Sequence, residues 1–288
     1  MDCKTVGIIA NGTKPGASEL VFSAASTLRH LGCSVIFDRS TAALLGETSE
    51  LSVKGLFRRC GLLVVLGGDG TLLQAVHEGS FPAPHIFGIN SGTLGFLTGA
   101  GPGDFEQTLT EVVAGKALIS VRSLLSVEVL RNGAPPWTGR ALNEVVVSRG
   151  ERSRVIRLEV EIDGVELTEY NADGLIVATP TGSTAYSLSA GGPVLAPDSG
   201  VFVITPICPH VLTNRSVIVN ERSTITVRPS EGQQGVCLTL DGRDPLPLEP
   251  GDLTRIRRSR QALRLVFPEG LPFFEVLRQK LKWSGKVV

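Results

Sequence analysis

The chain has 288 residues, 42% hydrophobic and 19% charged, so it is long enough for two domains and too apolar for an intrinsically disordered protein. Its 28 basic and 28 acidic side chains cancel to a formal net charge of zero, which argues against a nucleic-acid or membrane surface. The densest basic group, Arg255, Arg257, Arg258 and Arg260, is interpreted as a solvated strand edge or an interface.

The first segments predict a β-α-β unit. Residues 6–10 and 34–37 are short apolar strands, and residues 19–31 between them carry an apolar face at helical spacing. Two further apolar runs, 62–66 and 85–89, extend the same sheet. Parallel sheets of this kind bind ligands beyond the carboxyl ends of their strands.

A last helix completes the N-terminal domain. We expect Asp104 to cap a helix whose apolar face consists of Phe105, Leu109, Val112 and Val113. Residues 1–117 are therefore predicted to form an α/β domain with an open parallel sheet.

After residue 117 the pattern changes to β alternation. Residues 157–162 alternate apolar with polar side chains, and Asp163-Gly164 is typical of a hairpin turn. Similar runs follow, at 217–219, 224–227 and 237–240. We predict a β-sandwich domain over 118–264 and a tail over 265–288 that regains helical character.

A glycine-rich turn follows the apolar run 62–66. Gly67, Gly68 and Gly70 allow the backbone to approach a ligand closely, and the helix that begins after them offers free N–H groups suited to phosphate. Asp69 is repelled by phosphate unless a metal or a proton transfer uses it. The alternative is a turn aspartate that accepts bonds from local backbone N–H groups.

A second glycine- and hydroxyl-rich segment, 171–193, follows a strand. Its small donors suit a ribose or a phosphate, and Tyr186 adds a flat apolar face with a polar tip. The alternative is a Ser/Thr-rich loop that only caps a helix.

Asn143 and Glu144 precede a β-branched strand between these two segments. Asn can both donate to and accept from an adenine edge, and Glu can accept from ribose hydroxyls. The alternative is a strand-end pair that bonds nearby backbone.

These segments resemble a known family. The run Gly67-Gly68-Asp69-Gly70-Thr71 is similar to the signature of a kinase superfamily that includes NAD kinases, lipid kinases and, in a variant, phosphofructokinases. The run 171–193 resembles the second signature of NAD kinases, and the Asn-Glu pair lies between them in the family's order. Further segments agree over residues 6 to 283: 91–97, 205–210, 241–243 and 273–283. The chain is identified as a member of the bacterial-type NAD kinases.

The resemblance implies an activity. The γ-phosphoryl of ATP, or of polyphosphate, is transferred to the 2′-hydroxyl of the adenosine ribose of NAD, giving NADP, and Asp69 accepts the proton. The phosphate-donor loop is formed by Gly67, Gly68, Gly70 and Thr71. A divalent cation, Mg²⁺, accompanies the donor phosphates. The resemblance further implies a homodimer or homotetramer, and a tail that returns to pack on the first domain.

The resemblance also places the NAD contacts. They fall on Asp69, Gly70, Asn143, Glu144, Arg154, Asn171, Asp173, Thr184, Ala185, Tyr186, Ser187, Leu188, Ser189 and Arg243. Asn171 stands where some members of the family have a basic residue, and Arg243 stands where many have a glutamine. Arg243 either binds a phosphate or pairs with Asp244, and Arg154 is either a ligand contact or a surface residue.

The cysteines bear on the compartment. Cys3, Cys33, Cys60, Cys208 and Cys237 are odd in number and lack metal-ligand spacing, so they are read as reduced thiols of a cytoplasmic protein. Two competing functions remain, a lipid kinase and a catalytically inactive NADP sensor. The intact run 181–192 argues against the first, and the intact Asp69 argues against the second.

Overall fold

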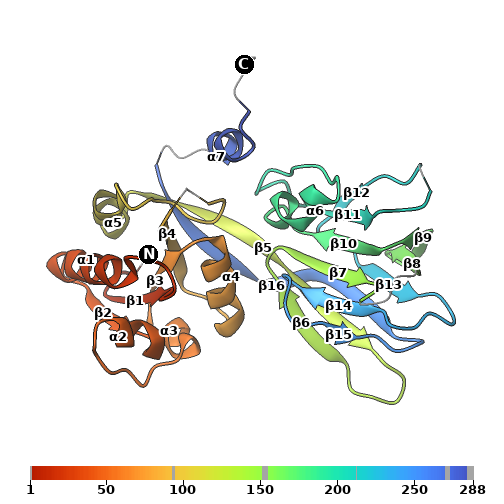
Figure 1. Ribbon diagram of the computed structural model, residues 1–288, viewed down its shortest axis with the longest axis horizontal. Coiled ribbons are helices and arrows are strands. Elements are labelled where there is room, and N and C mark those ends of the chain that lie inside the picture. Colours follow the sequence, from red (N-terminus) through yellow and green to blue (C-terminus); the bar gives the residue numbers. More distant parts are fainter. Residues whose placement is uncertain (1, 93–94, 151–154, 212, 270–272, 284–288) are drawn as a thin grey trace. The chain divides into compact units, whose positions relative to one another are not determined.

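The computed structural model describes residues 2–92, 95–150, 155–211, 213–269 and 273–283. The chain divides into two compact units (Figure 1). The first consists of residues 1–121 and 262–288, and the second of residues 122–261. Two strands, β5 (Ala117–Leu130) and β16 (Leu253–Pro268), begin in one unit and end in the other.

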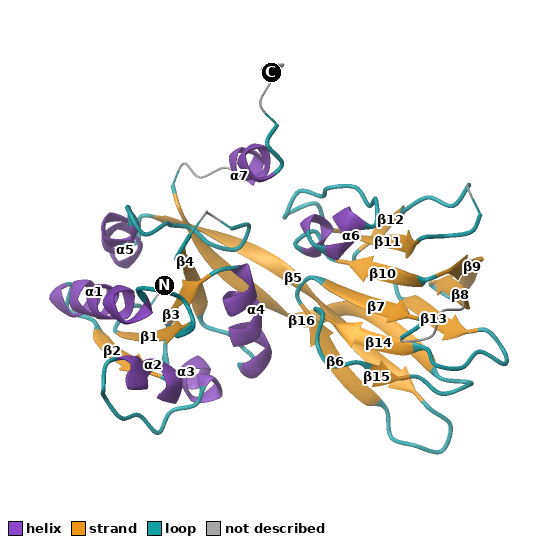
Figure 2. Cartoon of the chain, in the orientation of Figure 1, coloured by secondary structure: helices purple, strands orange, loops and turns teal. Residues whose placement is uncertain are grey.

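The first unit is an α/β domain (Figure 2). Its remaining elements, in chain order, are β1 (Thr5–Ala10), α1 (Ala17–His30), β2 (Ser34–Phe37), α2 (Arg39–Leu44), α3 (Val53–Arg59), β3 (Leu62–Gly67), α4 (Asp69–Glu78), β4 (His85–Asn90), α5 (Phe105–Val113) and α7 (Phe273–Lys280). The strands form a parallel sheet in the order β2-β1-β3-β4-β16. The predicted β-α-β unit and parallel sheet are confirmed.

The sheet of the first unit is buried on both faces. Val64 and its alternate neighbours in β3 join Leu28 of α1 and Leu109 of α5 in one hydrophobic core. On the opposite face, the space beside Gly7 is filled by Leu63 and by Leu56 of α3. Because both faces are covered, every residue of β3 is buried, which explains its continuous apolar sequence.

The strand order reverses next to β1. The chain runs from β1 to its neighbour β2 on one side, and later places β3 on the other side. In parallel sheets the segments that leave the strands at such a point diverge, and a ligand crevice opens at the carboxyl ends. The segments concerned follow Ala10 in β1 and Gly67 in β3.

The tail returns to the first unit, as the resemblance implied. Arg264 and Leu265 of β16 pair in parallel with His85 and Ile86 of β4. The helix α7 follows, and its Phe273 ring lies 6.3 Å, centroid to centroid, from the ring of Phe96.

The expected cap of α5 is wrong in one respect. Asp104 occupies the N-cap position, but its side chain makes no capping bond to the helix. Its carboxylate instead accepts from the backbone N–H of Gly101, at 2.8 Å, and only its carbonyl oxygen accepts from Thr108. A short side chain at this position can bond backward into its own loop as easily as forward into the helix.

The second unit contains two antiparallel sheets, as a β-sandwich requires. Its remaining elements are β6 (Trp137–Ala141), β7 (Glu144–Ser148), β8 (Ile156–Ile162), β9 (Val165–Ala172), β10 (Gly174–Ala178), η1 (Gly182–Thr184), α6 (Tyr186–Ser189), β11 (Val201–Ile207), β12 (Val217–Asn220), β13 (Ile225–Pro229), β14 (Cys237–Leu240) and β15 (Leu246–Pro247). One sheet has the order β12-β11-β10-β7-β14-β15, and the other contains β16, β13, β8 and β9 together with β5 and β6.

The core of the second unit lies between its sheets. Alternate residues of both sheets, such as Val147, Phe202 and Val160, meet in one buried cluster. The other face of β10 packs through Ile176 against Leu195, which follows α6. The segment after β10 therefore covers the outer face of its own sheet.

The predicted hairpin is confirmed. Strands β8 and β9 pair in antiparallel register on either side of Asp163 and Gly164, whose φ angles are 54° and 81°. Two consecutive positive φ angles are the requirement of a type I′ turn, which Asp-Gly satisfies at low cost.

The basic group on β16 has acidic partners. Arg255 and Arg257 both reach Glu128, at 3.3 and 3.1 Å, and Arg258 reaches Glu221 at 3.2 Å. None of the described helices is long and apolar enough to cross a membrane.

The burial of Phe87 gives a stability prediction. Its ring is fully buried in the core of the first unit, whereas Phe22 on α1 is 66% exposed. We expect Phe87→Ala to lower the free energy of unfolding by about 3 to 5 kcal/mol, because a cavity remains where the ring was. Phe22→Ala, the matched control, should change it by less than about 0.5 kcal/mol. Urea unfolding measures both, and equal midpoints for the two variants would contradict this packing.

Candidate active site

The carboxylate of Asp69 is held by a distant loop. Asp69 is the first residue of α4, directly after β3, and is half-buried. Its Oδ2 accepts from the N–H of Phe96 at 2.9 Å, and its Oδ1 accepts from the N–H of Leu97 at 3.0 Å. These partners lie 27 and 28 residues further along the chain. The Asp69 carboxylate therefore binds a distant loop and not the backbone N–H groups of its own turn.

Gly95 leaves the space that this carboxylate occupies. A Cβ atom on Gly95 would lie 2.0 Å from Oδ1 of Asp69. The N–H of Gly95 donates to the hydroxyl of Thr98, at 2.8 Å, and Thr98 is fully buried. This bond closes a turn over residues 95–98, from which the N–H groups of Phe96 and Leu97 reach Asp69.

The glycine turn before Asp69 is tightly packed. The side chain of Thr71 folds back over Gly67, where a Cβ would lie 2.3 Å from its hydroxyl oxygen. Gly70 is exposed, with open space within 4 Å of the position that a Cβ would take, and Gly68 is the N-cap without a side-chain cap. The first N–H groups of α4 therefore stay available at the carboxyl end of β3.

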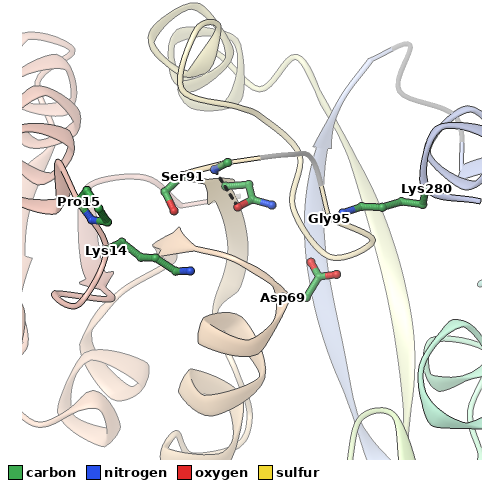
Figure 3. Close-up of a pocket in the computed structure, with 8 residues that line it drawn as sticks. Lys14, Pro15, Asp69, Ser91, Gly95 and Lys280 are labelled. Atoms are coloured by element: carbon green, nitrogen blue, oxygen red, sulfur yellow. Dashed lines mark hydrogen bonds between the residues drawn. The ribbon is translucent and has the colours of Figure 1, made fainter. Parts of the chain in front are cut away.

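A cavity of about 450 Å³ opens beside Asp69 (Figure 3). Its wall is polar and comes from segments that follow β1, β3 and β4, with one residue from α7: Lys14, Pro15, Asp69, Asn90, Ser91, Gly92, Gly95 and Lys280. The cavity lies at the carboxyl ends of these strands, where the reversal of strand order predicts a ligand crevice.

In the second unit, Asp241 organises the Asn-Glu pair. Its carboxylate accepts from the backbone N–H groups of Leu142, Asn143 and Glu144, at 2.8, 2.8 and 2.9 Å. Asp241 is buried and has a φ of 50°, in the left-handed region. Asp241 therefore satisfies the backbone of the Asn-Glu pair, so the side-chain oxygens of Asn143 and Glu144 are not needed for that purpose.

Burial changes the acidity of Glu144. Only 6% of this residue is exposed, and its Oε2 has no hydrogen-bond partner among the described residues. Desolvation, with the nearby negative charge of Asp241, raises the pKa of Glu144 to about 7, although a hydrogen bond from the backbone N–H of Tyr186 partly opposes the rise. Such a carboxyl can be either a donor or an acceptor near neutral pH.

The hydroxyl-rich segment folds back onto the same pair. Thr179 donates through its hydroxyl to the carbonyl of Leu142, at 2.6 Å, and through its N–H to the carbonyl of Asn143, at 2.9 Å. A Cβ on Gly182 would lie 2.1 Å from that carbonyl oxygen of Asn143. The segment therefore needs glycine here to reach the Asn-Glu pair.

Several hydroxyls of this segment are used by the fold. Ser183 donates to the carbonyl of Pro180, and the fully buried Ser187 shares a 3.0 Å hydrogen bond with Thr205. No side-chain bond caps η1 or α6. The residues that reach the surface are Thr184, Ala185, Tyr186, Leu188 and Ser189, of which Tyr186 is 45% exposed.

Asn171 and Asp173 lie at the other end of β10. Asp173 forms an ion pair with Arg149, Nε to Oδ1, at 3.1 Å, and Asn171 accepts from the N–H of His210 through its carbonyl. Thr179, at the opposite end of β10, is six residues away, which is about 20 Å along an extended strand. The unit therefore separates Asp173 from the group formed by Asn143, Glu144 and Tyr186, called here the Asn143–Tyr186 cluster.

Arg243 and Arg154 complete the predicted contacts. Arg243 is exposed in the turn after Asp241 and forms no ion pair with Asp244 or any other described residue. Arg154 lies outside the residues that the structure describes.

Known protein families match both units. Residues 6–117 match the model of the ATP-NAD kinase N-terminal domain, and residues 142–267 match that of the ATP-NAD kinase C-terminal domain. The chain belongs to the NAD kinase family. It is 41% identical to an NAD kinase of Symbiobacterium thermophilum, over 95% of this chain and 97% of the relative, and 39% identical to one of Geobacter sulfurreducens, over 98% and 100%.

Solved structures of the family share the fold. A yeast NADH kinase complexed with NADH superposes with a TM-score of 0.90 at 28% identity, covering 99% of this chain and 89% of that one. An Archaeoglobus fulgidus NAD kinase in complex with ATP gives a TM-score of 0.75 at 27% identity, covering 98% and 100%.

Sequence reasoning missed several residues of the two sites. Lys14 and Lys280 line the cavity, Asp241 fixes the Asn-Glu pair, and Arg149 pairs with Asp173. None of these roles had a local signal in the sequence: Asp241, for example, binds backbone N–H groups that lie 97 to 99 positions away along the chain.

The raised pKa of Glu144 predicts a pH dependence of stability. The folded state keeps a proton on Glu144 up to about pH 7, whereas an ordinary glutamate loses it near 4.5. Stability relative to Glu144→Gln should therefore fall as the pH rises from about 4.5 to 7, by up to about 3 kcal/mol, and then level off. Urea unfolding of both proteins from pH 4.5 to 8 measures the difference. The control is Glu166→Gln, at an exposed site on β9, whose stability relative to the wild type should not change in this way with pH. An equal pH dependence for Glu144→Gln and Glu166→Gln would contradict the raised pKa of Glu144.

Proposed function

We propose that Asp69 is the proton acceptor in the reaction of this NAD kinase. The family reaction forms a bond between the 2′-oxygen of the adenosine ribose of NAD and the γ-phosphorus of ATP, and breaks the bond from that phosphorus to the β–γ bridging oxygen. The products are NADP and ADP. The proton of the 2′-hydroxyl goes to the carboxylate of Asp69.

The observation that carries this proposal is the fixed carboxylate in the cavity wall. Asp69 is the one carboxylate among the described residues that line the cavity. Each of its oxygens accepts one backbone N–H and keeps a lone pair for a further donor. A carboxylate is a weak base toward an alcohol, so it orients the hydroxyl first and accepts the proton late, as the new oxygen–phosphorus bond forms.

The donor phosphates are placed at the start of α4. Phosphoryl transfer depends on alignment and on neutralising charge, and the first N–H groups of a ten-residue helix supply both. Gly67, Gly68, Gly70 and Thr71 form this loop. The A. fulgidus relative bound to ATP supports ATP as the donor; polyphosphate is the alternative.

A divalent cation, Mg²⁺, fits this site in one way. Mg²⁺ is commonly held by one or two carboxylates and by substrate phosphates. No cluster of three His, Cys, Asp or Glu side chains occurs among the described residues, so the ion would be carried by the donor phosphates with Asp69 as its protein ligand. When bound, it neutralises charge on the phosphoryl group.

The second unit is proposed to bind NAD. Asn143 and Glu144 offer two polar side chains whose backbone is already satisfied, and Tyr186 presents its ring at the surface beside them. The remaining contacts fall on the surface residues from Thr184 to Ser189, on Arg154, and on Arg243 as a phosphate contact. The yeast relative complexed with NADH supports a dinucleotide in this fold.

Asp173 and Asn171 favour an oligomer. They lie about 20 Å along β10 from the Asn143–Tyr186 cluster, too far for one small polar group of the ligand to contact both. A homodimer or homotetramer in which one copy supplies Asp173 to the cluster of another reconciles the two sets of contacts.

The cytoplasm is the proposed location. All five cysteines are free thiols, and Cys33 and Cys60 are buried with pKa values raised by desolvation. Unpaired thiols of this kind fit a reducing compartment.

The role of Asp69 predicts the effect of removing its charge. Asp69→Asn keeps the shape of the side chain but cannot take the proton, and its NH2 group cannot accept one of the two backbone N–H bonds that Asp69 accepts. NADP formation from NAD, ATP and Mg²⁺ should therefore fall by about 10²- to 10⁴-fold. NAD binding, measured by calorimetry, should be retained. A wild-type protein that binds NAD or NADH but makes no phosphorylated product with ATP or polyphosphate would instead favour the sensor function.

The close approach of Gly95 to Asp69 predicts that a side chain at position 95 lowers the rate of NADP formation. Gly95→Ala drives a methyl group into the Asp69 carboxylate, and a displacement of about 1 Å costs up to about 10²-fold in rate. The control is Gly103→Ala, in an exposed turn where no atom lies within 4 Å of the new methyl. Turnover within about twofold of the wild type in Gly95→Ala would show that the loop does not position Asp69.

A further inference from the structure

Two lysines from distant parts of the chain reach the cavity beside Asp69. Lys14 lies in the loop that leaves the carboxyl end of β1, and Lys280 is the last residue of α7, 266 positions later. Figure 3 shows their side chains extending from opposite sides toward the space above Asp69. Neither lysine forms an ion pair with any described residue, so both ammonium groups are available to a ligand.

The loop of Lys14 has a defined shape. Asn11 accepts from the N–H and the hydroxyl of Thr13 through its side chain, and from the N–H of Lys14 through its carbonyl. The carbonyl of Lys14 in turn accepts from Ala17, the first residue of α1. A side chain that leaves a fixed turn loses less entropy on binding than one on a free loop.

The position of Lys280 follows from the packing of α7. Phe273, Val276, Leu277 and Lys280 are spaced at i, i+3, i+4 and i+7, so they share one face of the helix. Val276 and Leu277 are buried, and Phe273 contacts Phe96, the residue whose N–H donates to Asp69. The face that anchors α7 to the Asp69 loop therefore also carries Lys280 to the cavity.

The cavity has the chemistry of a polyanion site. Its described wall holds two ammonium groups and one carboxylate, with Asn90 and Ser91 as further polar groups and no aromatic side chain that could stack on a base. A ligand with several clustered negative charges matches this wall, because both ammonium groups can donate charge-assisted hydrogen bonds to it.

We propose that Lys14 and Lys280 bind the terminal phosphates of the donor from two sides, with Lys280 supplied by the C-terminal helix. The proposal rests on the proposed function, because it places the donor in the Asp69 cavity. The two ammonium groups neutralise the phosphoryl group while it moves toward the 2′-oxygen, so they act on donor binding and on turnover but not on the binding of NAD.

The test compares Lys14→Gln and Lys280→Gln with two controls. Arg278→Gln removes a charge from an exposed position on the same helix, and Lys54→Gln removes an exposed lysine on α3; neither lines the cavity. In steady-state assays of NADP formation, each cavity variant should lower kcat/KM for ATP by about ten- to a hundredfold, the loss of one charge-assisted bond. KM for NAD should stay within about twofold.

The controls decide what any loss means. Lys54→Gln and Arg278→Gln should keep kcat/KM for ATP within about twofold of the wild type. An equal loss in Arg278→Gln would assign the effect to the general charge of α7 and overturn the proposal. An unchanged kcat/KM for ATP in Lys14→Gln or Lys280→Gln would overturn it directly.

A binding measurement separates this proposal from the proposed function. Calorimetric titration of each protein with Mg²⁺-ATP, without NAD, should show weaker binding in the two cavity variants than in the wild type and the controls. If the wild type makes no NADP, the proposed function fails, and this titration still decides whether the lysines bind the triphosphate. Equal affinity in all five proteins would overturn the proposal whatever the activity.

Discussion

The arrangement of the candidate active site depends on the hydrogen bonds that hold the carboxylate of Asp69. Asp69 stands at the end of a fully buried strand, where an unpaired charge would be costly, and two backbone N–H groups of the loop after β4 bind it. That arrangement requires glycine at position 95 and the buried hydroxyl of Thr98. The same loop contacts α7 through Phe96. One anchored side chain thus links the glycine turn, the loop after β4 and the C-terminal helix.

The second unit repeats this device with different residues. Asp241 accepts three consecutive backbone N–H groups and so holds the chain from Leu142 to Glu144. Its charge also disfavours ionisation of the buried Glu144 and helps to raise the pKa of that group to about 7. In both units, a carboxylate bound to backbone fixes the geometry of the groups beside it, and the N–H groups that it binds lie in a loop or at the start of a strand.

The sequence predicted the local features well because their causes are local. The buried run of β3, the glycines after it and the helix that starts at Asp69 follow from apolar pattern and backbone freedom within a short stretch of chain. The Asp163-Gly164 hairpin is equally local. Asp104 shows the limit of such reasoning. A short acidic side chain at a helix start can accept from its loop or from its helix, and the local sequence is the same in both cases; here it accepts from Gly101 in the loop.

Composition and local pattern, by themselves, determined the two fold classes and the chemistry of the glycine turn, and the order of the motifs determined the family. Tertiary structure alone decided the partners of Asp69, the anchoring of the Asn-Glu pair by Asp241, and the convergence of Lys14 and Lys280 on one cavity. The residues that these arrangements bring together are separated by 27 to 266 positions. No spacing rule covers such distances, because only the packing of the sheet and of α7 brings these residues together.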